Sequence, residues 1–106
     1  MQPIIRVSNI RCAPDKFAEL RRMMIEAEKT LRPGIETMRG FLAFYAGADE
    51  ETSSLTNVSL WADLESAKQL DHYQPMLDAG KEFVAKGAKF ERPIMNCATL
   101  WQMGES

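Results

Sequence analysis

The sequence is poor in the residues that build metal centres and disulfide frameworks. It has one histidine, His72, and two cysteines, Cys12 and Cys97, and no CxxC spacing occurs. A structural zinc site takes four such ligands at short spacings, so the sequence argues against one and we expect no bound metal. We also predict that Cys12 and Cys97 are buried thiols that lie too far apart to form a disulfide.

The sequence also lacks long apolar runs, phosphate-binding loops and an excess of basic charge. It has neither a P-loop nor a GxGxxG pattern, so a nucleotide has no evident seat and we expect no cofactor. No apolar run approaches the roughly 20 residues that span a bilayer, and the first residues do not read as a secretory signal. The 13 basic and 15 acidic residues leave a net charge of −2, which is unsuited to nucleic acid. We therefore expect a cytoplasmic protein with no nucleic-acid or membrane partner.

What remains is the composition of one globular domain over residues 1–106, with 45% apolar residues. Alternating and helical apolar periodicities predict six elements in the order strand, helix, strand, strand, helix, strand. The predicted strands are 4–10, 40–47, 55–61 and 94–101, and the predicted helical regions are 13–32 and 63–87, with Pro33-Gly34 ending the first. This is the split βαββαβ order of an α+β, ferredoxin-like fold, with a four-stranded antiparallel sheet and helices on one face.

The predicted strands are apolar on both faces, which a sheet with one solvated face would not be. Simple alternation in the second strand puts one set of side chains on one face and the other set opposite, namely Phe41, Ala43 and Tyr45 against Leu42, Phe44 and Ala46. Helices can cover only one of these faces, and the other would leave a larger apolar patch than monomers usually expose. We therefore predict a homodimer that pairs through the uncovered face.

The third strand carries the residues that most suggest a binding site. Asn57 and Trp61 are four residues apart on a strand, so their side chains share a face. A buried amide without a partner costs ~1–3 kcal/mol. Asn57 is therefore either a satisfied core residue beside a core tryptophan, or a residue that faces a cavity where a ligand bonds to it.

The chain resembles the antibiotic biosynthesis monooxygenase superfamily of dimeric α/β barrels over residues 4–101. The resemblance is carried by Arg32-Pro33-Gly34, by Gly40-Phe41, and by Asn57-Val58-Ser59-Leu60-Trp61 followed by Asp63-Leu64-Glu65-Ser66-Ala67. It implies a dimeric α/β barrel. Some members of this superfamily oxidise polycyclic phenols to quinones with O₂ and with neither metal nor flavin.

The resemblance also implies a set of site residues. Asn57 and Trp61 match the catalytic pair on the third strand, and Lys81 is the nearest match to a basic pocket residue on the later helix. Lys81 replaces an arginine there, and the two are not interchangeable at a bidentate site. We add Phe44, Met24 and His72 as candidate substrate-binding residues. For His72 the alternative is an exposed histidine at a helix end.

Two functions follow from this reading. The first is a cofactor-independent monooxygenase that acts on a small aromatic or quinol-type substrate in a pocket between sheet and helices. The substrate itself, as a phenolate or carbanion, would supply the electron to O₂, and Asn57 would stabilise the developing oxyanion. The second is a non-catalytic homodimer that binds a small apolar or aromatic ligand or serves as an accessory protein.

Overall fold

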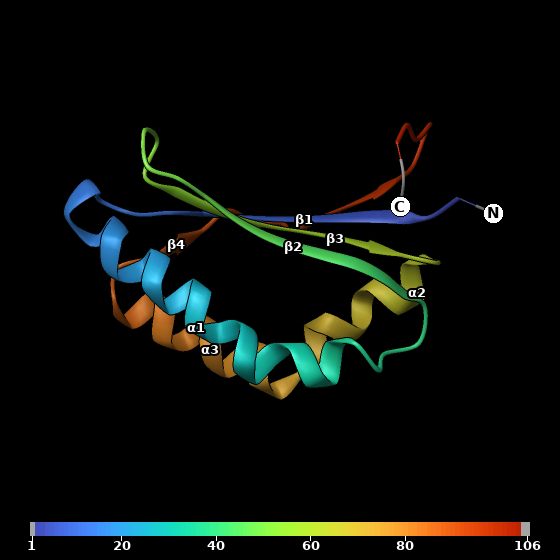
Figure 1. The fold of residues 1–106 in the computed structure, drawn as a ribbon, viewed down its shortest axis with the longest axis horizontal. Coiled ribbons are helices and arrows are strands. Elements are labelled where there is room, and N and C mark those ends of the chain that lie inside the picture. Colours follow the sequence, from blue (N-terminus) through green and yellow to red (C-terminus); the bar gives the residue numbers. More distant parts are fainter. Residues whose placement is uncertain (1, 105–106) are drawn as a thin grey trace.

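One antiparallel sheet carries a layer of helices on a single face in the computed structural model, which describes residues 2–104 (Figure 1). The strands are β1 (Ile4–Arg11), β2 (Phe41–Asp49), β3 (Ser54–Trp61), β4 (Lys89–Phe90) and β5 (Met95–Ala98). The helices are α1 (Phe17–Ile35), α2 (Leu64–Ala67) and α3 (Gln74–Ala85), with short 3₁₀ turns η1 (Pro14–Lys16) and η2 (Lys68–His72). The predicted α+β, ferredoxin-like arrangement is confirmed.

The strand order across the sheet is β2-β3-β1, and both β4 and β5 pair with the far edge of β1. The predicted last strand, 94–101, is shorter in the structure, and β4 is a fifth strand that the sequence does not predict. Pro93 lies between β4 and β5 and has no N–H for the ladder. Cys97 pairs with Ile5 and is exposed, so the prediction that it is buried is wrong. Cys12 is half-buried, and neither cysteine forms a disulfide within the described chain.

Helix α1 runs past the point where the sequence predicts its end. Pro33-Gly34 lies inside the last turn, where a proline removes only its own backbone hydrogen bond. Ile35 follows it and is buried in the core, and the Glu36 N–H still donates to the Arg32 carbonyl at 3.0 Å. The burial of Ile35 explains why the helix continues for this extra turn.

A β-bulge at Leu42 decides which side chains of β2 face the helices. The register with β3 shifts between Phe41 and Ala43, so Phe41 joins Phe44 on the helix-covered face and Leu42 is left 52% exposed. The Phe41 ring meets Trp61 edge-on, with 5.6 Å between the ring centroids. The predicted grouping of Phe41 with Ala43 and Tyr45 is wrong, because strict alternation does not survive an inserted residue.

The core lies between the sheet and the helices in two separate clusters, one near each end of the helix layer. One cluster contains Ile10, Phe17, Leu20, Leu55, Phe83 and Ala88. The other contains Ile35, Trp61, Ala67 and Leu70. Between the clusters the helix-covered face carries a polar row on β1 and β3, made of Arg6, Ser8, Asn57 and Ser59, in which Ser8 pairs with Asn57 and Arg6 pairs with Ser59.

The end of α1 is packed tightly against the start of α3 at Gly34. A Cβ built on Gly34 would lie only 2.1 Å from the Tyr73 hydroxyl oxygen. That hydroxyl donates a hydrogen bond to the Leu31 carbonyl at 3.2 Å. A glycine at this position therefore allows α1 and the start of α3 to approach closely, and Tyr73 packs against the second core cluster.

Replacing Gly34 by alanine is expected to destabilise the protein by about 1–3 kcal/mol, because the added methyl group displaces the Tyr73 ring. Gly80→Ala is the matched control, since Gly80 is also helical and its nearest neighbour to a built Cβ is a Phe90 carbon at 3.9 Å. That control should gain roughly 0.5–1 kcal/mol from helix propensity. Urea unfolding of both variants measures the difference, and equal stabilities would contradict the close contact.

Candidate functional site

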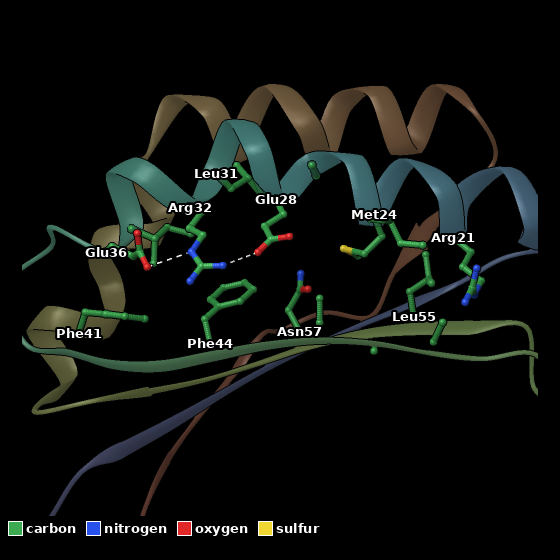
Figure 2. A pocket seen from close by; sticks show the side chains of 16 residues that line it. Arg21, Met24, Glu28, Leu31, Arg32, Glu36, Phe41, Phe44, Leu55 and Asn57 are labelled. Carbon is green, nitrogen blue, oxygen red and sulfur yellow. Dashed lines mark hydrogen bonds and ion pairs between the residues drawn. The ribbon is translucent and has the colours of Figure 1, made fainter. Parts of the chain in front are cut away.

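A pocket of about 510 Å³ lies between α1 and the helix-covered face of β2 and β3 (Figure 2). We call it the α1 pocket. Its walls are mainly apolar and include Met24, Leu31, Ile35, Phe41, Phe44 and Leu55. At its rim the Arg32 guanidinium donates to Glu28 at 2.6 Å and to Glu36 at 2.9 Å. The α1 pocket therefore offers an apolar space whose lining carboxylates are already paired.

A second pocket, of about 720 Å³, lies between α3 and the central strands and reaches the connection between β4 and β5. We call it the α3 pocket. Its apolar walls include Leu70, Met76, Leu77, Val84 and Phe90. Its charged lining is made of Arg6, Asp71, Lys81 and Arg92. The α3 pocket thus carries more positive than negative side chains, whereas in the α1 pocket Arg21 and Arg32 are balanced by Glu28 and Glu36.

Asn57 and Phe44 line both pockets, so the two spaces meet at these side chains. Asn57 stands on the sheet between Phe44 and Leu55 and points toward α1 (Figure 2). Its side-chain oxygen is buried and accepts no hydrogen bond from residues 2–104. Because native proteins rarely leave a buried amide oxygen unpaired, Asn57 is the strongest candidate for a functional residue on this face of the sheet.

Trp61 does not reach either of these pockets. Its side chain is 0% exposed in the second core cluster, and its indole N–H donates to the Ser59 hydroxyl at 2.9 Å. Ser59 lies between Asn57 and Trp61 on the same face of β3 and lines the α3 pocket. The hydrogen bond from Trp61 therefore holds this serine hydroxyl in place. The predicted direct contact of Trp61 with a substrate has no support in this geometry.

The other predicted site residues are divided between the two pockets. Met24 lines the α1 pocket, Lys81 lines the α3 pocket, and Phe44 lines both. His72 ends the 3₁₀ turn η2, is exposed and lines neither of these pockets. Its position is that of an exposed helix-end histidine, the alternative that the sequence left open.

Arg6 is a pocket residue to which sequence reasoning assigned no role. It lies on β1, its side chain is 7% exposed, and its guanidinium donates to Asp71 at 2.7 Å. The available signal was a cation placed between two apolar residues, Ile5 and Val7, on a predicted strand. Its partner could not be found in the same way, because Asp71 lies 65 residues further along the chain.

The turn η2, which carries Asp71, follows directly on the short helix α2, and α2 begins at a capping residue. The Asp63 carboxylate accepts the Ser66 N–H at 2.8 Å at the start of α2. The hydrogen bonds from Ser66 lower the pKa of Asp63. Its folded-state pKa is therefore below the unfolded value, so this cap stabilises the fold at neutral pH and is lost as the pH falls through the lowered pKa.

Two further features bear on the chemistry available. The part of the chain described here contains no group of three or more histidine, cysteine, aspartate or glutamate side chains placed to hold a metal ion. None of the helices within residues 2–104 is long and apolar enough to cross a membrane.

Replacing Asn57 by leucine is expected to raise the stability of the fold by about 1 kcal/mol, because a buried oxygen without a partner is removed. Ser59→Ala is the matched control two residues along the same face. It should cost roughly 1–3 kcal/mol, since it leaves the Trp61 N–H buried and unpaired. Thermal unfolding compares the two variants, and a destabilised Asn57→Leu protein would show that the amide serves the fold.

The sequence matches no protein-family model, and it matches no curated protein. Comparison with solved structures does find similar folds. SnoaB, a cofactor-independent oxygenase from Streptomyces nogalater, is 13% identical with a TM-score of 0.68, over 99% of this chain and 100% of that one. A proposed antibiotic biosynthesis monooxygenase from Nitrosomonas europaea is 9% identical with a TM-score of 0.70, over 97% and 95%.

The protein PA3566 from Pseudomonas aeruginosa is 16% identical with a TM-score of 0.67, over 95% of this chain and 97% of that one. These likenesses extend over nearly the whole length of both chains in each pair, so they concern all the elements of the fold described above. Identities of this size establish the fold and leave the chemistry to the site residues. The chain has the ferredoxin-like fold that these three proteins share.

Proposed function

We propose that the protein is a cofactor-independent monooxygenase that oxidises a small aromatic or quinol-type substrate between its sheet and its helices. The observation that carries this proposal is the buried, unpaired amide oxygen of Asn57 at the meeting point of two pockets. The fold that the chain shares with SnoaB, a cofactor-independent oxygenase, supports the type of chemistry.

In this proposal the substrate is its own electron donor. A ring with an acidic CH₂ or OH group loses a proton, and the resulting carbanion or phenolate passes an electron to O₂. The two radicals combine to a peroxide, which breaks down so that one oxygen atom becomes a quinone carbonyl. The other oxygen atom leaves as water with the two hydrogens of the substrate, which balances the reaction.

The protein would contribute position and electrostatics. Phe44 and Met24 hold the ring in an apolar space, which excludes water from the reactive anion. The Asn57 amide offers an N–H to the developing oxyanion and its unpaired oxygen to a substrate hydroxyl. Trp61 would contribute indirectly, because its indole N–H holds the Ser59 hydroxyl in place.

The second candidate is a non-catalytic dimer that binds a small apolar or aromatic ligand. One observation favours it. The three carboxylates that line the pockets, Glu28, Glu36 and Asp71, are each paired with an arginine. None of these carboxylates can accept a substrate proton without giving up its ion pair, so the substrate would have to ionise with little help from the protein.

Oxygen uptake in the presence of anthrone and naphthoquinol substrates separates the two candidates. The wild-type protein should consume O₂, and Asn57→Ala should lower kcat about 100-fold, as expected when an oxyanion donor is lost. Asn9→Ala removes the same amide from the opposite face of the sheet and should leave the rate within about twofold. If no member of the panel is oxidised while the aromatic compounds still bind, the ligand-binding function takes its place.

We further propose that two copies pair through the outer face, the sheet face turned away from the helices. Its centre is a block of apolar residues on four neighbouring strands, including Ile5, Val7, Val58, Leu60, Tyr45 and Met95. The C-terminal segment rises on this side of the sheet, and its Trp101 is 75% exposed (Figure 1). An apolar surface of this kind is typical of an interface between identical subunits.

Light scattering at micromolar concentration should give about twice the 12.0 kDa of one chain. Val58→Asp is expected to reduce this mass to that of one chain, because it places an unpaired charge at the centre of the outer face. Thr30→Asp adds the same charge on the exposed side of α1 and should leave the mass unchanged. A wild-type protein that scatters as a single chain would refute the dimer.

A further inference from the structure

Arg6 is a buried cation that is only partly satisfied by the chain. Its guanidinium makes one short contact, at 2.7 Å to Asp71. Its other contacts, to the Ala67 carbonyl and to the Asn96 side chain, are both 3.5 Å long. A guanidinium has five N–H donors, so one strong and two weak hydrogen bonds leave it able to bind a further acceptor.

The two partners of this ion pair differ in their access to water. The Asp71 side chain is 45% exposed, whereas that of Arg6 is 7% exposed. The carboxylate can therefore turn toward solvent at little cost, but the arginine cannot leave its place on the sheet. A buried cation without a negative partner is costly, so an incoming anion would be bound firmly if it replaced Asp71.

The rest of the α3 pocket has the same charge preference. Arg6, Lys81 and Arg92 line it against the single carboxylate of Asp71, which leaves an excess of two positive charges. The chain as a whole carries a net charge of −2, so positive charge is concentrated at this pocket. The Arg92 guanidinium lies over the Phe90 ring, 5.4 Å from its centroid, which keeps a cation at the pocket beside an apolar wall.

The remainder of the lining is apolar and continues to Phe44 and Asn57, which the α1 pocket shares. A fitting ligand therefore has an aromatic body beside Phe44 and a negatively charged group near Arg6. A neutral hydrocarbon would leave the cations of the pocket without a negative partner, and a small inorganic anion would leave its apolar walls exposed to water.

We infer that the α3 pocket binds the anionic group of an aromatic acid, a carboxylate or sulfonate, which Arg6 and Lys81 hold once it has displaced Asp71. This inference rests on the proposed function in one respect, because it names the substrate class of that same site as aromatic acids. Asp71 then acts as an internal competitor that occupies Arg6 in the free protein. Arg6 and Lys81 select the ligand, while the chemistry stays at Asn57.

The test compares two fluorescent probes that differ only in their charge. One is 1-anilinonaphthalene-8-sulfonate, and the other is N-phenyl-1-naphthylamine, which has the same rings without the sulfonate. Lys81→Met should weaken the binding of the anionic probe about fivefold and change that of the neutral probe less than twofold. Lys29→Met, on the exposed side of α1, is the matched control and should change neither.

Asp71→Asn gives the sharper result, because it removes the competitor and should tighten the binding of the anionic probe by about fivefold. Glu82→Gln removes a carboxylate from the exposed side of α3 and serves as its control. These two variants avoid the risk that a change at buried Arg6 prevents folding. If Arg6 and Asp71 form only a structural pair, Asp71→Asn will weaken the binding of the anionic probe or leave it unchanged, and the inference is overturned.

The inference is also overturned if Lys81→Met weakens the binding of both probes equally, since the dye then lies on another apolar surface such as the outer face. The titrations need neither O₂ nor turnover, so a protein that consumes no O₂ can still show the charge preference. Conversely, oxidation of neutral quinols by a protein without that preference would refute this inference alone.

Discussion

The polar row across the helix-covered face, made of Arg6, Ser8, Asn57 and Ser59, is the constraint on which the rest of the structure depends. A sheet of this size would normally bury one continuous apolar core beneath its helices. Here the middle of the face is hydrophilic, and helices α1 and α3 both contribute apolar side chains to the clusters at its two ends instead. Each large apolar side chain buried at those ends contributes roughly 1.5–3 kcal/mol, which supplies the stability that the centre lacks.

The members of the polar row meet the cost of burial in different ways. Ser59 accepts a hydrogen bond from Trp61, and Arg6 is paired with Asp71. The oxygen of Asn57 has no partner among the described residues and lies where both pockets meet. The fold therefore tolerates the unpaired oxygen of Asn57 at its centre, although it lowers the stability. A group that costs stability and lies beside a pocket is characteristic of a functional site.

The features that the sequence predicts are those with a local signature. The apolar periodicities locate the strands and helices except β4, and the amide of Asn57 in an apolar strand identifies a pocket residue. Pro33 led to the prediction that α1 ends too early, because proline usually terminates a helix. The helix continues because Ile35 is buried, and that burial is a property of the folded chain.

Other features depend on partners that are distant in sequence. The bulge at Leu42 becomes visible only when β2 is paired with β3, and it moves Phe41 to the face of the pocket. The pairing of Arg6 with Asp71 joins the first strand to a turn in the second half of the chain. No periodicity carries that information, which is why Arg6 and Asp71 were overlooked, whereas Lys81, Phe44 and Met24 were expected to line a pocket.

The position of the two pockets on the sheet has a consequence for how such a protein can diversify. The α1 pocket borders the edge strand β2, and the α3 pocket borders the opposite edge near β4 and β5. Only Phe44 and Asn57 belong to both. Substitutions along one edge can therefore accumulate without disturbing the other, so that the shape and the charge of an accepted molecule evolve as separate traits around one unchanged centre.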